Sequence, residues 1–465
     1  MIYRLAGVAA AIAFVAGSPS AAQTAGLQRQ ADALLAAAYP ADGPGASVVV
    51  TYHGKVIYEG NRGLADVANK RPITSRTVFR IGSITKQFAA AVVLQLASEG
   101  RLKLTDPINK YLPGYPQPGG SATIAQLLGH TSGIQSYTEI PGWMVESNFG
   151  HAYTTEQLMA VFKDLPSPSK PGEKWEYNNS GYVLVGAVIE AVTGRTWSSE
   201  VEQRIARPLE LTTLRYGIDE NKVPAMAVGY TLGDKGAVRA EKINMTVPGA
   251  AGALDATAGD LARWGNALHH GRVLSSTYYA QMITPAHLND GSTAAYGFGL
   301  GLSKLRGSTV IEHSGGINGF ASDSVYVPSA DVFVVVLANA VNPKSSSVAV
   351  ANRLAAMVMG KPYETFTARS LDAADITPFL GLYDFGNAKR VLSMREGRLY
   401  AQREGGTPAE IFPAGGGRYF YGPVNTTWFE LRRDTAGKPE MAFHADDLDA
   451  ETIGTYQGTA TSIGH

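Results

Sequence analysis

The sequence predicts an α/β protein of the α+β type: an antiparallel sheet flanked by helices, a helical lobe, and a small C-terminal all-β domain. Three observations predict this fold class. Strand patterns occur at both ends of the first unit, a mostly helical stretch lies between them at about 77–284, and short alternating runs follow Pro362. We expect the first unit to span 23–362 and the second to span 371–465.

The strands of the first unit begin after an amphipathic helix. Residues 26–38 place leucines and alanines on one face, and Gly43-Pro44-Gly45 ends that helix. The runs 47–52 and 55–58 are separated by His53-Gly54, which is a hairpin pattern. A sheet built from both ends would leave a cleft beside the helical lobe, where we expect the functional site. Later strands are expected at 309–313, 322–326 and 332–337, followed by a helix at 346–359.

The middle of the first unit contains three clear helix patterns. Apolar residues four apart form a stripe from Ser83 to Ser98, and Gly100 ends it. The second pattern covers 182–192, and the third covers 257–268 with Thr257 as its N-cap.

The C-terminal unit has a different pattern of hydrophobic and polar residues. Its alternating runs are short, with Glu396-Gly397 and Ala436-Gly437 as hairpin turns between them. We therefore expect a small all-β fold such as a barrel. The runs lie at 391–394, 398–401, 418–421, 427–431 and 440–443.

Composition narrows the classes of function. Hydrophobic residues make up 45% and charged residues 17% of the 465 residues, which is a globular composition. The 40 basic and 40 acidic residues balance, so nothing in the charge indicates nucleic acid. The absence of cysteine excludes disulfides, thiolate metal sites and cysteine nucleophiles. We expect no metal and no cofactor, because the sequence contains no His-Glu-x-x-His motif and no phosphate-binding Gly-Lys-Ser/Thr loop.

The first residues have the pattern of a cleavable signal peptide, placed at 1–22. Arg4 precedes an apolar stretch of about 13 residues, which is too short to span a bilayer. Small residues follow, and we expect cleavage after Ala22. The mature protein would then be periplasmic or secreted, with no stable membrane span.

Gly82-Ser83-Ile84-Thr85-Lys86 is the first motif that carries chemistry. At the start of a helix, this spacing places Lys86 one turn after Ser83 on the same face. A serine hydroxyl needs a neighbouring base, and a lysine serves as one only if burial or nearby cations lower its pKa. Taken alone, the motif is more typical of an N-cap serine followed by a surface lysine.

Two further motifs follow at wide spacing. Tyr177-Asn178-Asn179 precedes a helix, so the Tyr177 phenol can enter a cleft and shuttle protons, while Asn179 can hold Lys86 and donate to a substrate amide. His313-Ser314-Gly315-Gly316 ends a strand, and the N–H groups of Gly316 and Ser83 would form a two-donor oxyanion hole. Taken alone, these motifs also suit a packing tyrosine before an N-cap asparagine, and a tight turn with a solvent-facing histidine.

Together and in this order, the three motifs resemble those of the serine β-lactamase and penicillin-binding superfamily. The similarity is to the branch of class C β-lactamases, D-alanyl-D-alanine carboxypeptidases, D-aminopeptidases and related esterases, the S12 peptidases. It covers about 27–359. The supporting stretches are 79–87, 100–107, 124–133, 171–182 and 313–320.

The resemblance implies a β-lactamase/transpeptidase-like fold and an acyl-enzyme on Ser83, with Lys86 and Tyr177 sharing the proton transfers. Which of the two is the acylation base stays open. Asn179, His313 and Gly315 would bind the substrate. His313 stands where β-lactamases of this branch usually carry a lysine that anchors a carboxylate, and a histidine is only partly charged at neutral pH. The resemblance therefore favours a peptidase or esterase over a β-lactamase.

We therefore expect an exported serine hydrolase whose partner is a small-molecule or peptide substrate, either a D-amino-acid peptide or a small ester. The alternatives are a β-lactamase and a penicillin-binding sensor that acylates without turnover. A Gly-x-Ser-x-Gly elbow is absent, which argues against an α/β-hydrolase. The C-terminal unit resembles lipocalin-like domains that cover the cleft or mediate oligomerisation in some relatives. The stretch 136–167, with Tyr137, Trp143, Met144 and Phe149, either lines an acyl pocket or packs the lobe.

Overall fold

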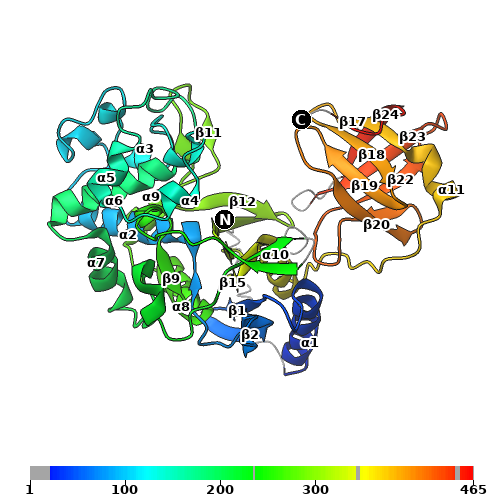
Figure 1. Cartoon of the computed structure of the whole chain (residues 1–465), viewed down its shortest axis with the longest axis horizontal. Coiled ribbons are helices and arrows are strands. Elements are labelled where there is room, and N and C mark those ends of the chain that lie inside the picture. Colours follow the sequence, from blue (N-terminus) through cyan, green and yellow to red (C-terminus); the bar gives the residue numbers. More distant parts are fainter. Residues whose placement is uncertain (1–20, 234–235, 342–345, 446–450, 464–465) are drawn as a thin grey trace, which may run out of the picture.

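The computed structural model describes residues 21–233, 236–341, 346–445 and 451–463. A mixed α/β unit with a helical lobe precedes a closed β-barrel (Figure 1). Almost all of the predicted signal segment lies outside the described residues. Within the described ranges, no helix combines the length and apolarity that crossing a bilayer requires.

The central sheet has six strands in the order β12-β13-β14-β15-β1-β2, and every neighbouring pair is antiparallel. The N-terminal hairpin thus pairs with the last strand of the late meander, and the predicted sheet built from both ends of the unit is confirmed. The strands are β1 Ala46–Tyr52, β2 Lys55–Arg62, β12 Gly301–Leu305, β13 Ser308–Ile317, β14 Phe320–Val327 and β15 Val332–Ala338.

Helices cover both faces of this sheet. Val48 and Val50 of β1 pack into an apolar cluster with α1 (Ala21–Ala38) and α10 (Ser347–Val358). Val49, between them in sequence, packs into the second cluster on the opposite face, as the period of two in a strand requires. This second face is covered by α2 (Thr85–Ser98) and α8 (Ala258–His269).

The predicted helix from Ser83 to Ser98 differs at its start. A 3₁₀ turn occupies Gly82–Ile84, and the α-helix begins at Thr85. The reason lies at Gly82, whose φ of +51° is left-handed and whose added Cβ would stand 2.9 Å from the backbone nitrogen of Gly316. The chain passes so close to β13 here that it turns sharply before the regular helix begins.

The helical lobe is centred on α6 (Asn179–Thr193), which begins three residues earlier than predicted. Its N-cap is Asn178, whose side chain accepts from the Gly181 N–H at 2.8 Å, and Gly194 ends the helix as expected. Thr257 caps α8, as predicted. The other helices of the first unit are α3 Ile124–Leu128, α4 Glu146–Phe149, α5 Thr155–Ala160, α7 Trp197–Val201 and α9 Ser276–Met282.

Four small sheets and several 3₁₀ turns connect these elements. The three-stranded sheet β5-β9-β6 lies next to the turn at Ser83, because Ile81 N–H donates to the Leu254 carbonyl at 3.0 Å. The small strands are β3 Leu64–Asp66, β4 Arg71–Pro72, β5 Phe79–Arg80, β6 Arg215–Tyr216, β7 Tyr230–Gly233, β8 Gly236–Arg239, β9 Leu254–Ala256, β10 Ala286–His287, β11 Thr293–Ala294 and β16 Ala340–Val341.

The C-terminal unit is a closed eight-stranded barrel preceded by α11 (Ala373–Ile376). The five predicted runs fall on β18, β19, β21, β22 and β23, and both predicted hairpin turns join neighbouring strands. Three strands were not predicted, and one of them, β20, contains Pro413, which interrupts the strand pattern. The strands are β17 Gly381–Asp384, β18 Lys389–Arg395, β19 Arg398–Arg403, β20 Ala409–Gly415, β21 Arg418–Phe420, β22 Trp428–Arg433, β23 Pro439–His444 and β24 Thr452–Gly458.

A buried arginine joins the barrel to the sheet. Arg353 on α10 donates to the carbonyl oxygens of Val424 at 2.9 Å, Asn425 at 2.7 Å and Glu364 at 3.0 Å. The barrel therefore sits on the α10 side of the sheet, away from the helical lobe (Figure 1).

Candidate active site

Lys86 is the centre of a hydrogen-bonded cluster between α2 and α6. Its side chain is fully buried, with 0% exposure. The ammonium nitrogen Nζ lies 3.0 Å from Ser83 Oγ, 2.9 Å from Asn179 Oδ1 and 2.8 Å from the Ala251 carbonyl oxygen. Burial holds the pKa of Lys86 well below its usual value of 10.5.

These three partners dictate how a neutral Lys86 amine must orient. A neutral amine has two hydrogens and one lone pair, and the oxygens of Asn179 and Ala251 can only accept. The two hydrogens therefore point at those oxygens, and the lone pair faces the Ser83 hydroxyl. In this arrangement the amine can take the Ser83 proton without first moving.

Tyr177 lies on the other side of Ser83 and Lys86. Its ring centroid is 4.6 Å from Lys86 Nζ, and its phenol shares a hydrogen bond with Ser83. Burial raises the pKa of Tyr177, against a smaller lowering by the Ser83 hydrogen bond. The phenol therefore keeps its proton at neutral pH, whereas the neighbouring amine is the group that burial deprotonates.

Asn179 is held from two sides. Its Oδ1 accepts from Lys86, and its Nδ2 donates to Thr138 Oγ1 at 3.2 Å. The Ser136 hydroxyl accepts from the Asn179 backbone N–H at 3.3 Å and lies 2.9 Å from Thr138 Oγ1. One Nδ2 hydrogen of Asn179 is thus left for a substrate. Sequence reasoning missed Ser136 and Thr138, because a hydroxyl in a loop carries no spacing signal.

His313 lies within β13 and is 6% exposed, so the solvent-facing turn considered from the sequence is wrong. Its Nδ1 lies 2.6 Å from the Ser314 carbonyl oxygen, and its Nε2 lies 2.7 Å from the Tyr296 hydroxyl. A carbonyl only accepts, so Nδ1 carries the proton and Nε2 accepts from Tyr296. Burial, together with the nearby Lys86, lowers the pKa of His313 to about 3, so the imidazole is neutral.

The two glycines after His313 have different surroundings. A Cβ added to Gly315 would lie 2.2 Å from the Ile81 carbonyl oxygen, so this position must be glycine for the strand to pack against the chain before Ser83. A Cβ added to Gly316 would meet nothing within 4 Å. Gly316 therefore has open space where a side chain would stand, and it lies beside the turn at Gly82 that precedes Ser83.

His130 fixes the position of the Tyr177 segment and was not predicted as a site residue. Its Nδ1 accepts from the Asn178 N–H at 3.1 Å, and its backbone carbonyl accepts from the Glu176 N–H at 2.9 Å. Its ring packs 4.4 Å from the Tyr177 ring, centroid to centroid. Burial is the main cause that lowers the pKa of His130 well below 6.5, so this imidazole is also neutral.

The stretch 136–167 packs the lobe at some positions and faces solvent at others. Tyr137 and Phe149 are buried, with 3% and 5% exposure, and the Tyr137 hydroxyl donates to the Val247 carbonyl at 3.0 Å. Met144 is 39% exposed. Tyr137 and Phe149 thus belong to the core of the lobe.

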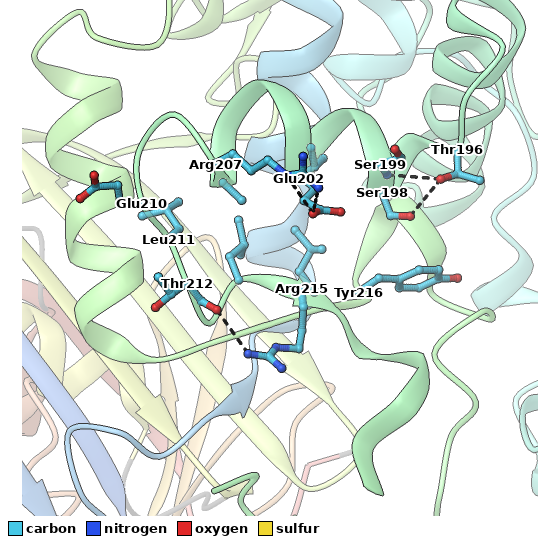
Figure 2. Close-up of a pocket in the computed structure, with 14 residues that line it drawn as sticks. Thr196, Ser198, Ser199, Glu202, Arg207, Glu210, Leu211, Thr212, Arg215 and Tyr216 are labelled. Atoms are coloured by element: carbon cyan, nitrogen blue, oxygen red, sulfur yellow. Dashed lines mark hydrogen bonds and ion pairs between the residues drawn. The ribbon is translucent and has the colours of Figure 1, made fainter. Parts of the chain in front are cut away.

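Two pockets are relevant to the location of the site. The larger, of about 870 Å³, lies beside α7 and contains none of the predicted site residues (Figure 2). In this pocket Arg207 pairs with Glu202 at 2.8 Å, and Arg215 donates to the Thr212 carbonyl oxygen (Figure 2). The smaller, of about 250 Å³, is lined by Tyr177 and His313 and therefore adjoins Ser83.

Comparisons with known proteins show which family the chain is similar to. The Beta-lactamase family model matches residues 33–357. A D-aminopeptidase of Gluconobacter oxydans is 28% identical, over 90% of this chain and 75% of its own length. The solved structure of a D-stereospecific amidohydrolase from Streptomyces sp. is 32% identical with a TM-score of 0.59, covering 69% of this chain and 94% of its own.

A third relative extends the similarity of fold to the barrel. The octameric penicillin-binding protein homologue from Pyrococcus abyssi has a TM-score of 0.65 and covers 93% of this chain and 99% of its own, at 24% identity. The architecture of both units is therefore one that a solved protein shares.

Proposed function

This chain belongs to the beta-lactamase family, and on that premise we propose that it hydrolyses amides of D-amino acids or of short peptides that contain them. The reaction proceeds through an acyl-enzyme on Ser83. The observation that carries the proposal is the fully buried Lys86 amine, whose Nζ lies 3.0 Å from Ser83 Oγ and whose pKa is lowered by burial. The similarity to a D-aminopeptidase and to a D-stereospecific amidohydrolase supports the substrate class.

Lys86 is the acylation base in this proposal. It takes the Ser83 proton as Oγ attacks the carbonyl carbon, and the N–H groups of Ser83 and Gly316 stabilise the oxyanion. Tyr177, which is protonated in the free enzyme and hydrogen-bonds to Ser83, donates its proton to the departing amine. Lys86 then gives the proton that it took from Ser83 to the Tyr177 phenolate. In deacylation Lys86 takes a proton from the attacking water, and the released Ser83 Oγ takes that proton back from Lys86. Asn179 orients Lys86 and donates its remaining N–H to the acyl group.

A β-lactamase activity has weaker support. A β-lactam presents a carboxylate, and a fixed positive charge on the leaving-group side is the simplest anchor for it. His313 occupies that place here as a neutral imidazole whose two nitrogens already have partners. Small esters need no such anchor, and we propose them as secondary substrates of the same Ser83 chemistry.

Incubation of the purified protein with D-alanine amide, L-alanine amide, a p-nitrophenyl ester and a fluorescent penicillin tests this function. We expect ammonia release from the D-amide to exceed that from the L-amide, and to vanish in Ser83→Ala. The matched control is Ser98→Ala, an exposed serine at the end of the same helix. A stable penicillin adduct without amide turnover would instead support a sensor. Amide turnover in Ser83→Ala would show that Ser83 is not the nucleophile.

Export is a separate proposal, supported by the sequence pattern at 1–22. We propose that signal peptidase cleaves after Ala22 and that the mature chain carries a catalytic unit at 23–362 and a barrel unit at 371–465. Mass spectrometry of the protein recovered from a periplasmic or culture fraction measures the N-terminus. Recovery of an intact Met1 in the cytoplasmic fraction would contradict this proposal.

A further inference from the structure

The hydroxyl group of Tyr296 is the partner that fixes the hydrogen-bonding state of His313. Tyr296 lies in the segment before β12 and is 6% exposed. The Ser314 carbonyl oxygen lies 2.6 Å from His313 Nδ1 and can only accept, so Nδ1 carries the ring proton and Nε2 offers a lone pair. The Tyr296 hydroxyl lies 2.7 Å from Nε2 and therefore donates to that lone pair.

This hydrogen bond opposes protonation of His313. A second ring proton on Nε2 would stand between the two groups, and the Tyr296 hydroxyl hydrogen would need another acceptor. The neighbours of the Tyr296 ring are themselves rings, since the centroids of His130, Trp175 and Tyr177 lie 4.7, 6.0 and 6.4 Å away. Burial raises the pKa of Tyr296 well above 10, so the phenol does not give up its proton instead. The pair thus stabilises the neutral imidazole in addition to burial.

The titratable groups near His313 on the Ser83 side of the sheet are also shifted toward their uncharged forms. Burial is the main cause that lowers the pKa of His130 well below 6.5, and it lowers the pKa of Lys86 well below 10.5. Burial also raises the pKa values of the phenols of Tyr177 and Tyr182. The His313 imidazole therefore has no carboxylate among these neighbours that would stabilise its protonated form.

The two acids that line the pocket of about 250 Å³ lie on the opposite face of the sheet. Side chains alternate along β13, and Ile311 packs into the cluster beneath the helical lobe, so His313 shares that face. Glu312, between them, faces α10, and Asp323 shares its face because it stands opposite Ser314 in the register. On the face of Ser83, the described pocket walls are thus aromatic or imidazole side chains without a fixed charge.

We propose that Tyr296 is a positioning residue that sets the specificity for the leaving group. By donating to His313 Nε2, it keeps this face of the pocket uncharged. Amides whose departing amine lacks a carboxylate are then favoured, and peptides whose departing residue ends in a free α-carboxylate are disfavoured. The inference rests on the proposed amide hydrolysis, because Tyr177, which donates its proton to the departing amine, has its ring centroid 6.1 Å from that of His313 in the same pocket.

Two substrates of equal length test this specificity. D-alanylglycine and D-alanylglycinamide differ only in whether the departing residue ends in a carboxylate or a carboxamide. For the wild type we expect kcat/KM to be at least tenfold higher for the carboxamide, because the carboxylate finds no cationic partner. This ratio should be the same at about pH 5.5 and about pH 8, since the pKa of His313 is lowered to about 3. A ratio near one, or a ratio that falls at the lower pH, would overturn the proposal.

Tyr296→Phe removes the hydroxyl and keeps the ring. His313 Nε2 then loses its donor, and a carboxylate in the pocket can stabilise the protonated imidazole. We expect the preference for the carboxamide to fall at least fivefold at about pH 5.5 and to change less at about pH 8. Adding His313→Asn to Tyr296→Phe should abolish this pH dependence. Tyr278→Phe, which removes a partly buried phenol on α9, is the matched control and should keep the wild-type ratio. Equal losses for both substrates at both pH values in Tyr296→Phe would mean a structural role only and would overturn the proposal.

NMR spectra of Ser83→Ala labelled with ¹⁵N-histidine measure the state of His313 without hydrolysis, and His313→Asn assigns its signals. We expect Nδ1 to be protonated and Nε2 unprotonated down to about pH 5, whereas adding Tyr296→Phe should raise the pH of protonation by at least about one unit. A proton on Nε2 of the neutral ring in the Ser83→Ala protein would overturn the proposal, even if Tyr296→Phe does not fold. If these spectra agree but no D-alanyl amide is hydrolysed, the proposed function fails and the assignment of Tyr296 stands. If D-alanine amide is hydrolysed while Tyr296→Phe changes neither the ratio nor the titration, the assignment of Tyr296 fails and the function stands.

Discussion

Replacing Lys86 by methionine should flatten the rise of the protein's stability with pH in the window that ends near pH 10.5. Burial lowers the pKa of Lys86 in the folded protein, whereas the unfolded chain returns it to about 10.5. Between the two pKa values the unfolded state holds one more proton than the folded state. Stability therefore falls as pH decreases through this window, and it recovers fully only above the unfolded pKa.

The size of the effect follows from that single proton. Where the unfolded state holds one more proton than the folded state, the free energy of unfolding of the wild type rises by about 1.4 kcal/mol per pH unit. Lys86→Met removes this slope. It also leaves the Asn179 and Ala251 oxygens without a donor, at about 1–3 kcal/mol each. Because that loss is independent of pH, the comparison must use slopes and not absolute stabilities.

Urea denaturation at pH 7.5, 8.5 and 9.5, followed by tryptophan fluorescence, measures both slopes. The sequence has no cysteine, so no thiol titrates in this window. The lowered pKa values of His130 and His313 move those groups further below it. Lys304→Met, an exposed lysine on β12, is the matched control and should keep the wild-type slope. If the free energy of unfolding rises with pH at the same slope in the wild type and in Lys86→Met, the pKa of Lys86 is not lowered by burial. The assignment of Lys86 as the base would then be refuted as well.

Three further predictions concern groups around the nucleophile. Tyr177→Phe should lower kcat for a D-amino acid amide by about 10²–10⁴ in steady-state assays, and a wild-type kcat would remove the phenol from the proton relay. His130→Phe deprives the Asn178 N–H of its acceptor and should lower kcat more than it raises KM. His130→Asn keeps an acceptor and suits the positive φ of +59°, so this variant should retain most of the activity. Equal losses of kcat in the two variants would argue against this positioning role. Gly82→Ala should lower the free energy of unfolding by about 1–3 kcal/mol in urea titrations, since φ is +51° and Gly316 leaves no room, whereas Gly259→Ala in α8 meets no close atom and should be tolerated.

The central sheet could be predicted because its signals are local. The runs at 47–52 and 332–337 are continuous β-branched stretches bounded by turns, and the structure pairs them in one sheet. Strands of two or three residues, such as β5 and β9, carry no such pattern, and they exist only because the chain around Ser83 is already fixed. The barrel strand β20 is similar, since closure pairs it with β19 and β21 despite Pro413.

The candidate site likewise contains residues that the sequence could predict and others that only the fold brings to it. Ser83, Lys86 and Asn179 could be named because their residue types and spacing have few other uses together. The structure places Ser83 Oγ 3.0 Å and Asn179 Oδ1 2.9 Å from Lys86 Nζ. The Ala251 carbonyl could not be named, because every residue has a carbonyl and only the tertiary fold selects this one. His130 lay in a stretch that supported the family resemblance, but its bond to the Asn178 N–H depends on a left-handed backbone that residue types alone do not reveal.

The charge state of the site follows from burial and not from ion pairing. The lowered pKa of Lys86 has desolvation as its cause, and burial, with a smaller contribution from the nearby Lys86, lowers the pKa of His313 in the same direction. A protonated lysine at position 313 would lower the pKa of Lys86 further, but it would also attract carboxylates to the leaving-group side. With a neutral imidazole there, burial alone lowers the pKa of the base, and His313 supplies no positive charge on the leaving-group side. The histidine that weakens the case for a β-lactamase is therefore also the residue that leaves the leaving-group side without a fixed cation.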